Sequence, residues 1–361
     1  MIEVLFVEDE VDFIKPILDD IHQKVQDVNC TISGFDDVEE KIRSLRPNIV
    51  VLDLIEGPLS DNNRGIAYLD FIWKQQFCPV IVHTGFPDLF EGYENPFVQL
   101  IQKGQDSSEN LLESIRYFEP HVRSLKEVDD HIRESFASAL RDVAPYAFDT
   151  FEEVKQRNDA ILRAGRRRLA GLMDEHPGEG QVLASWEQYL CPPISEDILL
   201  GDILRETDRE GTDPSLFRVV LSPSCDLVSS GGRQPKISEI LVARCCSIKR
   251  GVELMGWGNI NAGKLKDRLN PILSRGYSDT LVPLPALKSR IPTMMANLRD
   301  LELIPFGDVS SEGSRFIRVA SLDSPFRELI SWAYMQVSAR PGVPDRDTVS
   351  WCDEIVDDYQ S

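Results

Sequence analysis

Five polar residues, each at the end of an apolar run, have types and an order that could do chemistry. Glu8 and Asp9 follow the run IEVLFV, and Asp53 follows IVVL. Thr84 closes the run VIVHT, and Lys103 follows VQLIQ. If these runs are parallel strands of one sheet, their carboxyl ends share a single crevice. We therefore expect the five side chains to converge on one site.

Three carboxylates at one point repel one another unless a cation neutralises them, and Mg²⁺ suits such an oxygen-rich set. We expect Glu8, Asp9 and Asp53 to hold that ion. The Asp53 carboxylate can then act as a nucleophile toward a phosphoryl group and form an acyl phosphate. The Thr84 hydroxyl and the Lys103 ammonium would donate hydrogen bonds to the phosphoryl oxygens.

These motifs, FVEDE, VVLDL, VIVHTG and IQKG, resemble those of the receiver domain of bacterial response regulators. The resemblance covers about the first third of the chain. It implies that Asp53 is the phosphoacceptor, with Mg²⁺ as cofactor and Thr84 and Lys103 as its catalytic neighbours. It also implies that a histidine kinase or a phosphotransfer protein is the donor. The phosphorylated domain would then signal to a downstream protein partner.

Three positions depart from the receiver pattern. The loop after Asp53, which contains Glu56–Pro58, is longer than the family usually has. Gly104 follows Lys103, where the family carries a proline. Leu100 stands where the family carries an aromatic switch residue, so the signal must pass through other residues.

The spacing of apolar residues predicts three regions. Residues 1–120 alternate apolar runs with amphipathic segments, which indicates an α/β fold: a doubly wound, five-stranded parallel sheet of the receiver or flavodoxin-like type. Residues 121–185 are predicted to form a helical hairpin or connector, interrupted at Pro145, with Thr150 and Glu153 as a capping box for its second helix. Such a hairpin is compatible with a homodimer.

Residues 186–361 are predicted to form an α+β output domain, with a small β-barrel as one form of it. Strands are expected at 199–204, 217–222, 240–247 and 316–321, and helices at 261–272 and 325–335. The segments GDIL and FRVVLSPS are similar, over a short stretch, to the small barrel of MazF/PemK-like ribonuclease toxins.

The turn that contains Cys225 and Asp226 is the other candidate site in this region. A strand-end cysteine can be a nucleophile, but all five histidines lie at or before residue 176, so a Cys–His dyad within the region is excluded. An inert cysteine in a turn is the simpler interpretation. Catalysis by this region therefore stays undecided.

Charge and composition limit the partners. The net charge of the 361 residues is −21, and residues 1–120 alone hold 23 acidic and 9 basic side chains. Such a chain disfavours nonspecific binding to nucleic acid or anionic lipid. The sequence has no run of about 20 apolar residues and no basic, signal-like start. We therefore expect a cytoplasmic bacterial protein without membrane segments.

Three functions remain open at this point. The first is a two-component phosphorelay response regulator whose output acts by protein contacts. The second is a receiver that controls an enzymatic effector, such as a nuclease-like domain acting on nucleic acid. Its support is the basic stretch 244–299 and the turn with Cys225 and Asp226. The third is a receiver-like scaffold that is not phosphorylated.

Overall fold

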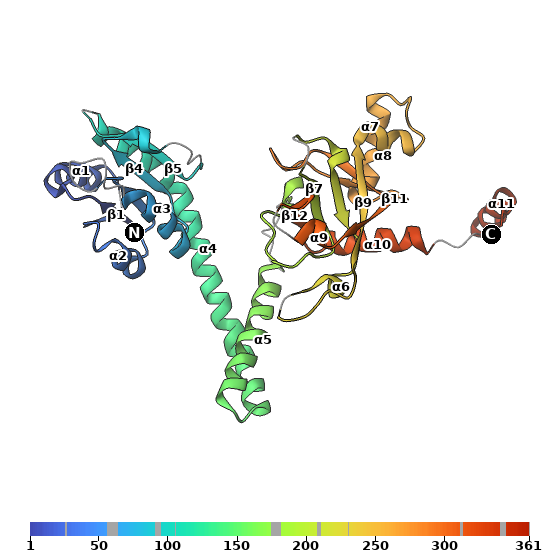
Figure 1. Ribbon diagram of the computed structural model, residues 1–361, viewed down its shortest axis with the longest axis horizontal. Helices are drawn as coiled ribbons and strands as arrows, with labels where there is room; N and C mark the ends of the chain where they lie inside the picture. The colour runs from blue at the N-terminus through green and yellow to red at the C-terminus, as the bar shows by residue number, and fades with distance from the viewer. Residues whose placement is uncertain are drawn as a thin grey trace. The chain divides into compact units, whose positions relative to one another are not determined.

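The structure, a computed structural model, divides into two compact units, residues 1–179 and 180–361 (Figure 1). Each unit is described by itself. The structure describes residues 1–25, 27–55, 64–90, 95–104, 106–174, 182–207, 211–229, 231–310, 313–339 and 344–360. No helix among these residues is both long and apolar enough to cross a membrane.

The first unit contains a parallel five-stranded sheet in the order β2-β1-β3-β4-β5, as predicted. The chain moves from β1 outward to β2 and then crosses back to β3, so the switch point of the sheet lies between β1 and β3. The elements of this unit are β1 (Ile2–Val7), α1 (Val11–Lys24), β2 (Val28–Ser33), α2 (Val38–Leu45), β3 (Ile49–Leu52), α3 (Arg64–Gln75), β4 (Val80–Thr84), the 3₁₀ turn η1 (Pro87–Phe90), β5 (Val98–Gln102), α4 (Ser107–Thr150) and α5 (Val154–Asp174).

Helices cover both faces of this sheet. On one face, α1 and the first part of α4 pack through Ile17 and Ile115. On the other, α2 and α3 pack through Ile42 and Ile72. Every residue of β3 is buried, because a strand in the middle of a doubly wound sheet has helices on both sides. This packing fixes the ends of the strands.

The hairpin of α4 and α5 corrects two details of the sequence analysis. Helix α4 continues through Pro145 to Thr150, and the buried Ala147 lies beyond the proline. A proline removes one main-chain donor, but here the helix does not stop. Thr150 is the last residue of α4, and its hydroxyl donates to the carbonyl of Tyr146 at 2.7 Å, so it does not cap α5. Because α4 also runs through residue 120, the three-part division at 120 and 185 stays a prediction.

The second unit is built on a seven-stranded antiparallel sheet in the order β10-β11-β9-β8-β7-β12-β6. Its elements are the 3₁₀ turn η2 (Ser185–Gln188), β6 (Tyr189–Leu190), β7 (Asp202–Glu206), the 3₁₀ turn η3 (Pro214–Leu216), β8 (Phe217–Val220), α6 (Ser224–Leu227), β9 (Glu239–Ser247), α7 (Ile248–Leu254), α8 (Ala262–Arg275), β10 (Leu281–Leu284), β11 (Met294–Pro305), α9 (Gly307–Ser310), β12 (Phe316–Leu322), α10 (Phe326–Ser338) and α11 (Thr348–Gln360).

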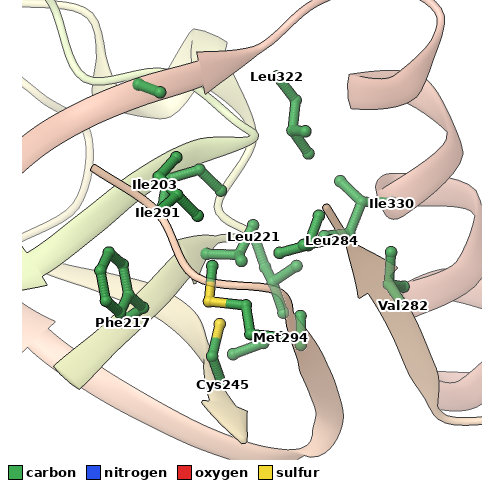
Figure 2. Close-up of a cluster of buried hydrophobic side chains, with 14 of the residues drawn as sticks. Ile203, Phe217, Leu221, Cys245, Val282, Leu284, Ile291, Met294, Leu322 and Ile330 are labelled. Atoms are coloured by element: carbon green, nitrogen blue, oxygen red, sulfur yellow. The ribbon is translucent and has the colours of Figure 1, made fainter. Parts of the chain in front are cut away.

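The main core of this unit lies between the sheet and α10. Figure 2 shows Ile330 of that helix near Leu284 and Val282 of β10, with Phe217 and Ile203 in the same cluster. The sheet curls, since the Tyr189 hydroxyl of β6, at one end of the strand order, donates to the Pro285 carbonyl just past β10 at the other end, at 2.9 Å. The strand order nevertheless ends at β6 and β10, so the described sheet is a curled α+β sheet and not a closed barrel.

Candidate functional site

The carboxyl ends of β1, β3, β4 and β5 carry the five residues that the sequence singled out. Parallel pairing sets β1 against β3, β3 against β4 and β4 against β5. Glu8 and Asp9 follow β1 directly, Asp53 follows β3, Thr84 is the last residue of β4 and Lys103 follows β5. The topology therefore brings all five to one edge of the sheet.

Lys103 bridges two of the carboxylates. Its Nζ lies 2.7 Å from Asp53 Oδ2 and 2.6 Å from Glu8 Oε2. The side chains are largely buried, with 19% of Lys103, 9% of Asp53 and 3% of Glu8 exposed. Because water screens such pairs poorly, these contacts are stronger than ion pairs on the surface. Lys103 therefore partly neutralises the acidic cluster.

Burial and the bridge act in opposite directions on the ionisation of this cluster. Burial raises the pKa of Glu8, and the hydrogen bond from Lys103 offsets this only in part. Burial also disfavours the charged form of Lys103, but its hydrogen bonds to Asp53 and Glu8 prevail and raise its pKa. Lys103 is consequently a cation throughout the neutral range, and the carboxyl groups of Glu8 and Asp53 both lie within hydrogen-bond distance of it.

The three carboxylates fit a hard cation. Each of Glu8, Asp9 and Asp53 offers an oxygen, and these oxygens all lie within 4.8 Å of one another. Asp9 is exposed, whereas Glu8 and Asp53 are buried, so an ion would enter the site from the side of Asp9. Mg²⁺ prefers a small number of protein carboxylates as ligands, with its remaining positions filled by water, and this cluster suits that preference.

Thr84 and His83 lie at the end of β4. Thr84 is fully buried, and its Oγ1 accepts a hydrogen bond from the Phe86 main-chain N–H at 3.2 Å. A hydroxyl that accepts still has its own proton to donate. His83 is 1% exposed, and burial, reinforced by the charge of Lys103, lowers its pKa to about 4. His83 is therefore neutral near pH 7.

Gly65, at the start of α3, is a part of the site that the sequence analysis did not recognise as one. A side chain here would overlap the Asp53 carbonyl oxygen and come within 2.5 Å of the Leu54 Cα. The Gly65 N–H donates to the Leu54 carbonyl at 3.0 Å, which ties the helix to the end of β3. The sequence offered no clear signal for this role, because Gly57 stands nearer to Asp53 than Gly65 does.

Of the departures from the receiver pattern, one falls outside the described residues and another can be located. Glu56–Pro58, in the loop after Asp53, lie outside the described residues. Leu100 lies on β5 opposite Val82, and 42% of its surface is exposed. A small, exposed aliphatic side chain at that place differs from the aromatic residue of the receiver pattern.

Cys225 and Asp226 belong to the short helix α6. Cys225 is exposed, with its Sγ 3.5 Å from Asp226 Oδ1, and Asp226 pairs with Lys236 at 3.0 Å. The neighbouring hydroxyls serve the main chain: Ser222 Oγ accepts from the Leu241 N–H, and Ser224 Oγ from the Leu200 N–H. These contacts explain the segment as a turn that joins neighbouring parts of the fold.

No protein-family model matches the sequence, and no curated protein matches it. Solved structures of response regulators match part of the chain. The receiver domain of the response regulator PhyR from Erythrobacter litoralis is 27% identical, with 32% of this chain and 90% of that chain covered and a TM-score of 0.26.

Two further structures show likenesses of the same size. An anti-anti-sigma factor PhyR from Bartonella quintana is 20% identical over 33% of this chain and 50% of that chain, with a TM-score of 0.25. A response regulator from Burkholderia pseudomallei, solved with a phosphorylated aspartic acid and a calcium ion, is 13% identical over 46% of this chain and 98% of that chain, with a TM-score of 0.26. Similarity at this level carries no functional argument, so the function must be argued from the site itself.

Proposed function

We propose that residues 1–120 form a phosphoacceptor receiver and that Asp53 takes a phosphoryl group from a phosphohistidine of a kinase or a phosphotransfer protein. The observation that carries the proposal is the Lys103 bridge to Asp53 and Glu8, at 2.7 and 2.6 Å, with Asp9 in reach of the same point. A lysine and three carboxylates at the switch point of a parallel sheet form a site suited to phosphoryl transfer.

In the proposed step, an Asp53 carboxylate oxygen attacks phosphorus, the phosphorus–nitrogen bond of the donor breaks, and the imidazole nitrogen takes up a proton. The Lys103 ammonium moves from the carboxylate to a phosphoryl oxygen, and the Thr84 hydroxyl donates to another. Glu8, Asp9 and Asp53 would hold Mg²⁺, which when bound supplies positive charge against the phosphoryl oxygens.

The phosphoryl group on Asp53 carries a charge of about −1.5 to −2 in place of the single charge of the free carboxylate, and it draws Lys103 and Thr84 toward it. Lys103 then leaves Glu8, and the β4 and β5 ends repack. Helix α4 begins four residues after Lys103 and packs against the same sheet through Leu111 and Ile115, so it is the element we expect to carry the change onward to a downstream protein partner.

The test is phosphoryl incorporation into the full chain from acetyl phosphate with Mg²⁺, read as the mass of the intact protein. We expect one added phosphoryl group on the wild type and none on Asp53→Asn. Asp20→Asn, which removes a carboxylate of the exposed pair with Lys24, is the matched control and should be phosphorylated normally. A wild-type protein that stays unmodified, also with a panel of phosphorylated histidine kinases, would favour a receiver-like scaffold instead.

A further inference from the structure

The hairpin of α4 and α5 has a defined conformation. Arg157 closes its turn, donating to the Phe151 carbonyl at 3.1 Å with its guanidinium 4.1 Å from the centre of the Phe148 ring. Farther along, Arg168 pairs with Asp142 at 2.7 Å. The two helices therefore present a fixed surface to their surroundings.

Small residues are the fully buried ones in the seam between the two helices, among the described residues 123–174. Ala139, Ala147 and Gly165 are buried, and a side chain at Gly165 would lie 2.6 Å from Leu140 Cδ2. The large apolar residues of the hairpin are half-buried or exposed. They include Val128, Ile132, Phe136, Leu140, Val143, Ile161, Leu162, Leu169, Leu172 and Met173. Two helices touch along one line, so each large side chain is covered on one side alone.

The apolar face of α5 is wider than α4 alone can cover. Ile161, Gly165 and Leu172 recur at helical spacing along the seam, and Gly165 contacts α4. Leu162 and Leu169 form a second stripe beside the first, and Leu162 is 43% exposed. A second stripe at this spacing is typical of a helix inside a bundle with more than one neighbour.

The charges of the two helices indicate what the missing neighbour is. The hairpin part of α4, residues 123–150, has six acidic and four basic side chains, while α5 has six basic and two acidic ones. Another α4 would be repelled by α4, but it would be attracted by α5. In a symmetric pairing with a second copy of the hairpin, the acidic α4 of each chain would face the basic α5 of the other, so two favourable contacts of this kind would form.

We propose that two copies of this chain associate through their hairpins into an antiparallel four-helix bundle, in which α5 of each copy packs against α4 of the other. The stripe that contains Leu162 and Leu169 then becomes part of the bundle core. The exposed Arg166 and Arg167 lie beside the acidic side chains of α4 in the second copy. This association does not require Asp53 chemistry, and so it stands or falls separately from the proposed function.

The experiment is sedimentation equilibrium of the full chain over the micromolar range. The expected mass is twice the 40.8 kDa of one chain. Leu162→Glu places a charge in the proposed core and should raise the dimer dissociation constant about 100-fold, equivalent to roughly 3 kcal/mol. Because Leu162 is 43% exposed in a single chain, the far-ultraviolet circular dichroism of the variant should keep its helical content.

Two matched variants separate this surface from others. Leu303→Glu changes a 57% exposed leucine of the second unit, and Leu100→Glu changes the exposed leucine of β5; both should leave the dimer intact. Arg166→Glu combined with Arg167→Glu should weaken it, and more so at low salt. A wild-type chain that is monomeric throughout, or a dimer that Leu100→Glu breaks and Leu162→Glu does not, would overturn the proposal.

Discussion

Gly65 packs its main chain directly against the carbonyl group of Asp53, so that any side chain at 65 runs into the end of β3. We expect Gly65→Ala to push α3 away from Asp53, to cost about 1–3 kcal/mol of unfolding free energy, and to slow phosphoryl uptake. Gly171→Ala in α5 is the matched control, because its new methyl group meets nothing within 4 Å and should be neutral or stabilising. Urea unfolding and mass spectrometry measure the two effects; equal stability of both variants would contradict the expectation.

Lys103→Met removes the cation that bridges two buried carboxylates. With Glu8 and Asp53 left facing each other, we expect a loss of roughly 3 kcal/mol in unfolding free energy at neutral pH. Phosphoryl uptake should fall about 100-fold, because a donor to the transferred group is lost. Lys15→Met, which breaks an exposed pair with Asp12, should change neither quantity appreciably. A Lys103→Met protein that takes up phosphate at the wild-type rate would exclude the proposed role of this lysine.

Asp9→Asn should weaken Mg²⁺ binding about tenfold, since affinity for this ion follows the number of charged ligands. Asp9 is exposed, so its replacement should leave the fold unchanged. Isothermal calorimetry with MgCl₂ measures the affinity, and Glu10→Gln, the next exposed carboxylate, provides the comparison. If Glu10→Gln weakened binding and Asp9→Asn did not, the assignment of ligands would be wrong.

The burial of His83 predicts that the protein loses stability in acid. Its pKa is about 4 in the folded chain and 6.5 in the unfolded chain, so between these values only the unfolded chain binds the proton. The stabilisation it gives is present above pH 6.5 and is lost as the pH falls toward 4, by on the order of 3 kcal/mol. His83→Gln should flatten the difference between unfolding at pH 7 and at pH 4.5, whereas the exposed His131→Gln should not. A wild-type and a His83→Gln protein with the same pH dependence would refute this explanation.

The parallel sheet was predictable because its central strands β1, β3 and β4 are short and apolar on both faces, and because the strands alternate with amphipathic helices. The convergence of the five site residues required no further information, since the carboxyl ends of parallel strands meet at one edge. Lys103 was predicted to contact a phosphoryl group. Its bridge between Glu8 and Asp53 depends on side-chain geometry that strand-end positions do not encode.

The second unit was harder to predict. Strand β11 was missed because its register shifts between Asn297 and Leu301, which breaks the alternation of apolar and polar residues, and because Arg299 and Asp300 fall at that shift. The predicted strand at 199–204 begins three residues late in the structure, since Gly201 has a φ of +82° and turns the chain before β7. The curl of the sheet rests on Tyr189 and Pro285, which are far apart in the sequence.

Helix α4 holds 44 residues without interruption, and at 1.5 Å per residue it is about 66 Å long. Its first turns are anchored in the sheet core, and Val122 is the last of the anchored residues. The 28 residues beyond it form a lever of about 42 Å, so that a tilt of about 10° at the anchor would displace the tip by roughly 7 Å. A tilt of the anchored turns, whatever its cause, would thus become a movement the size of a side chain at the tip of the hairpin.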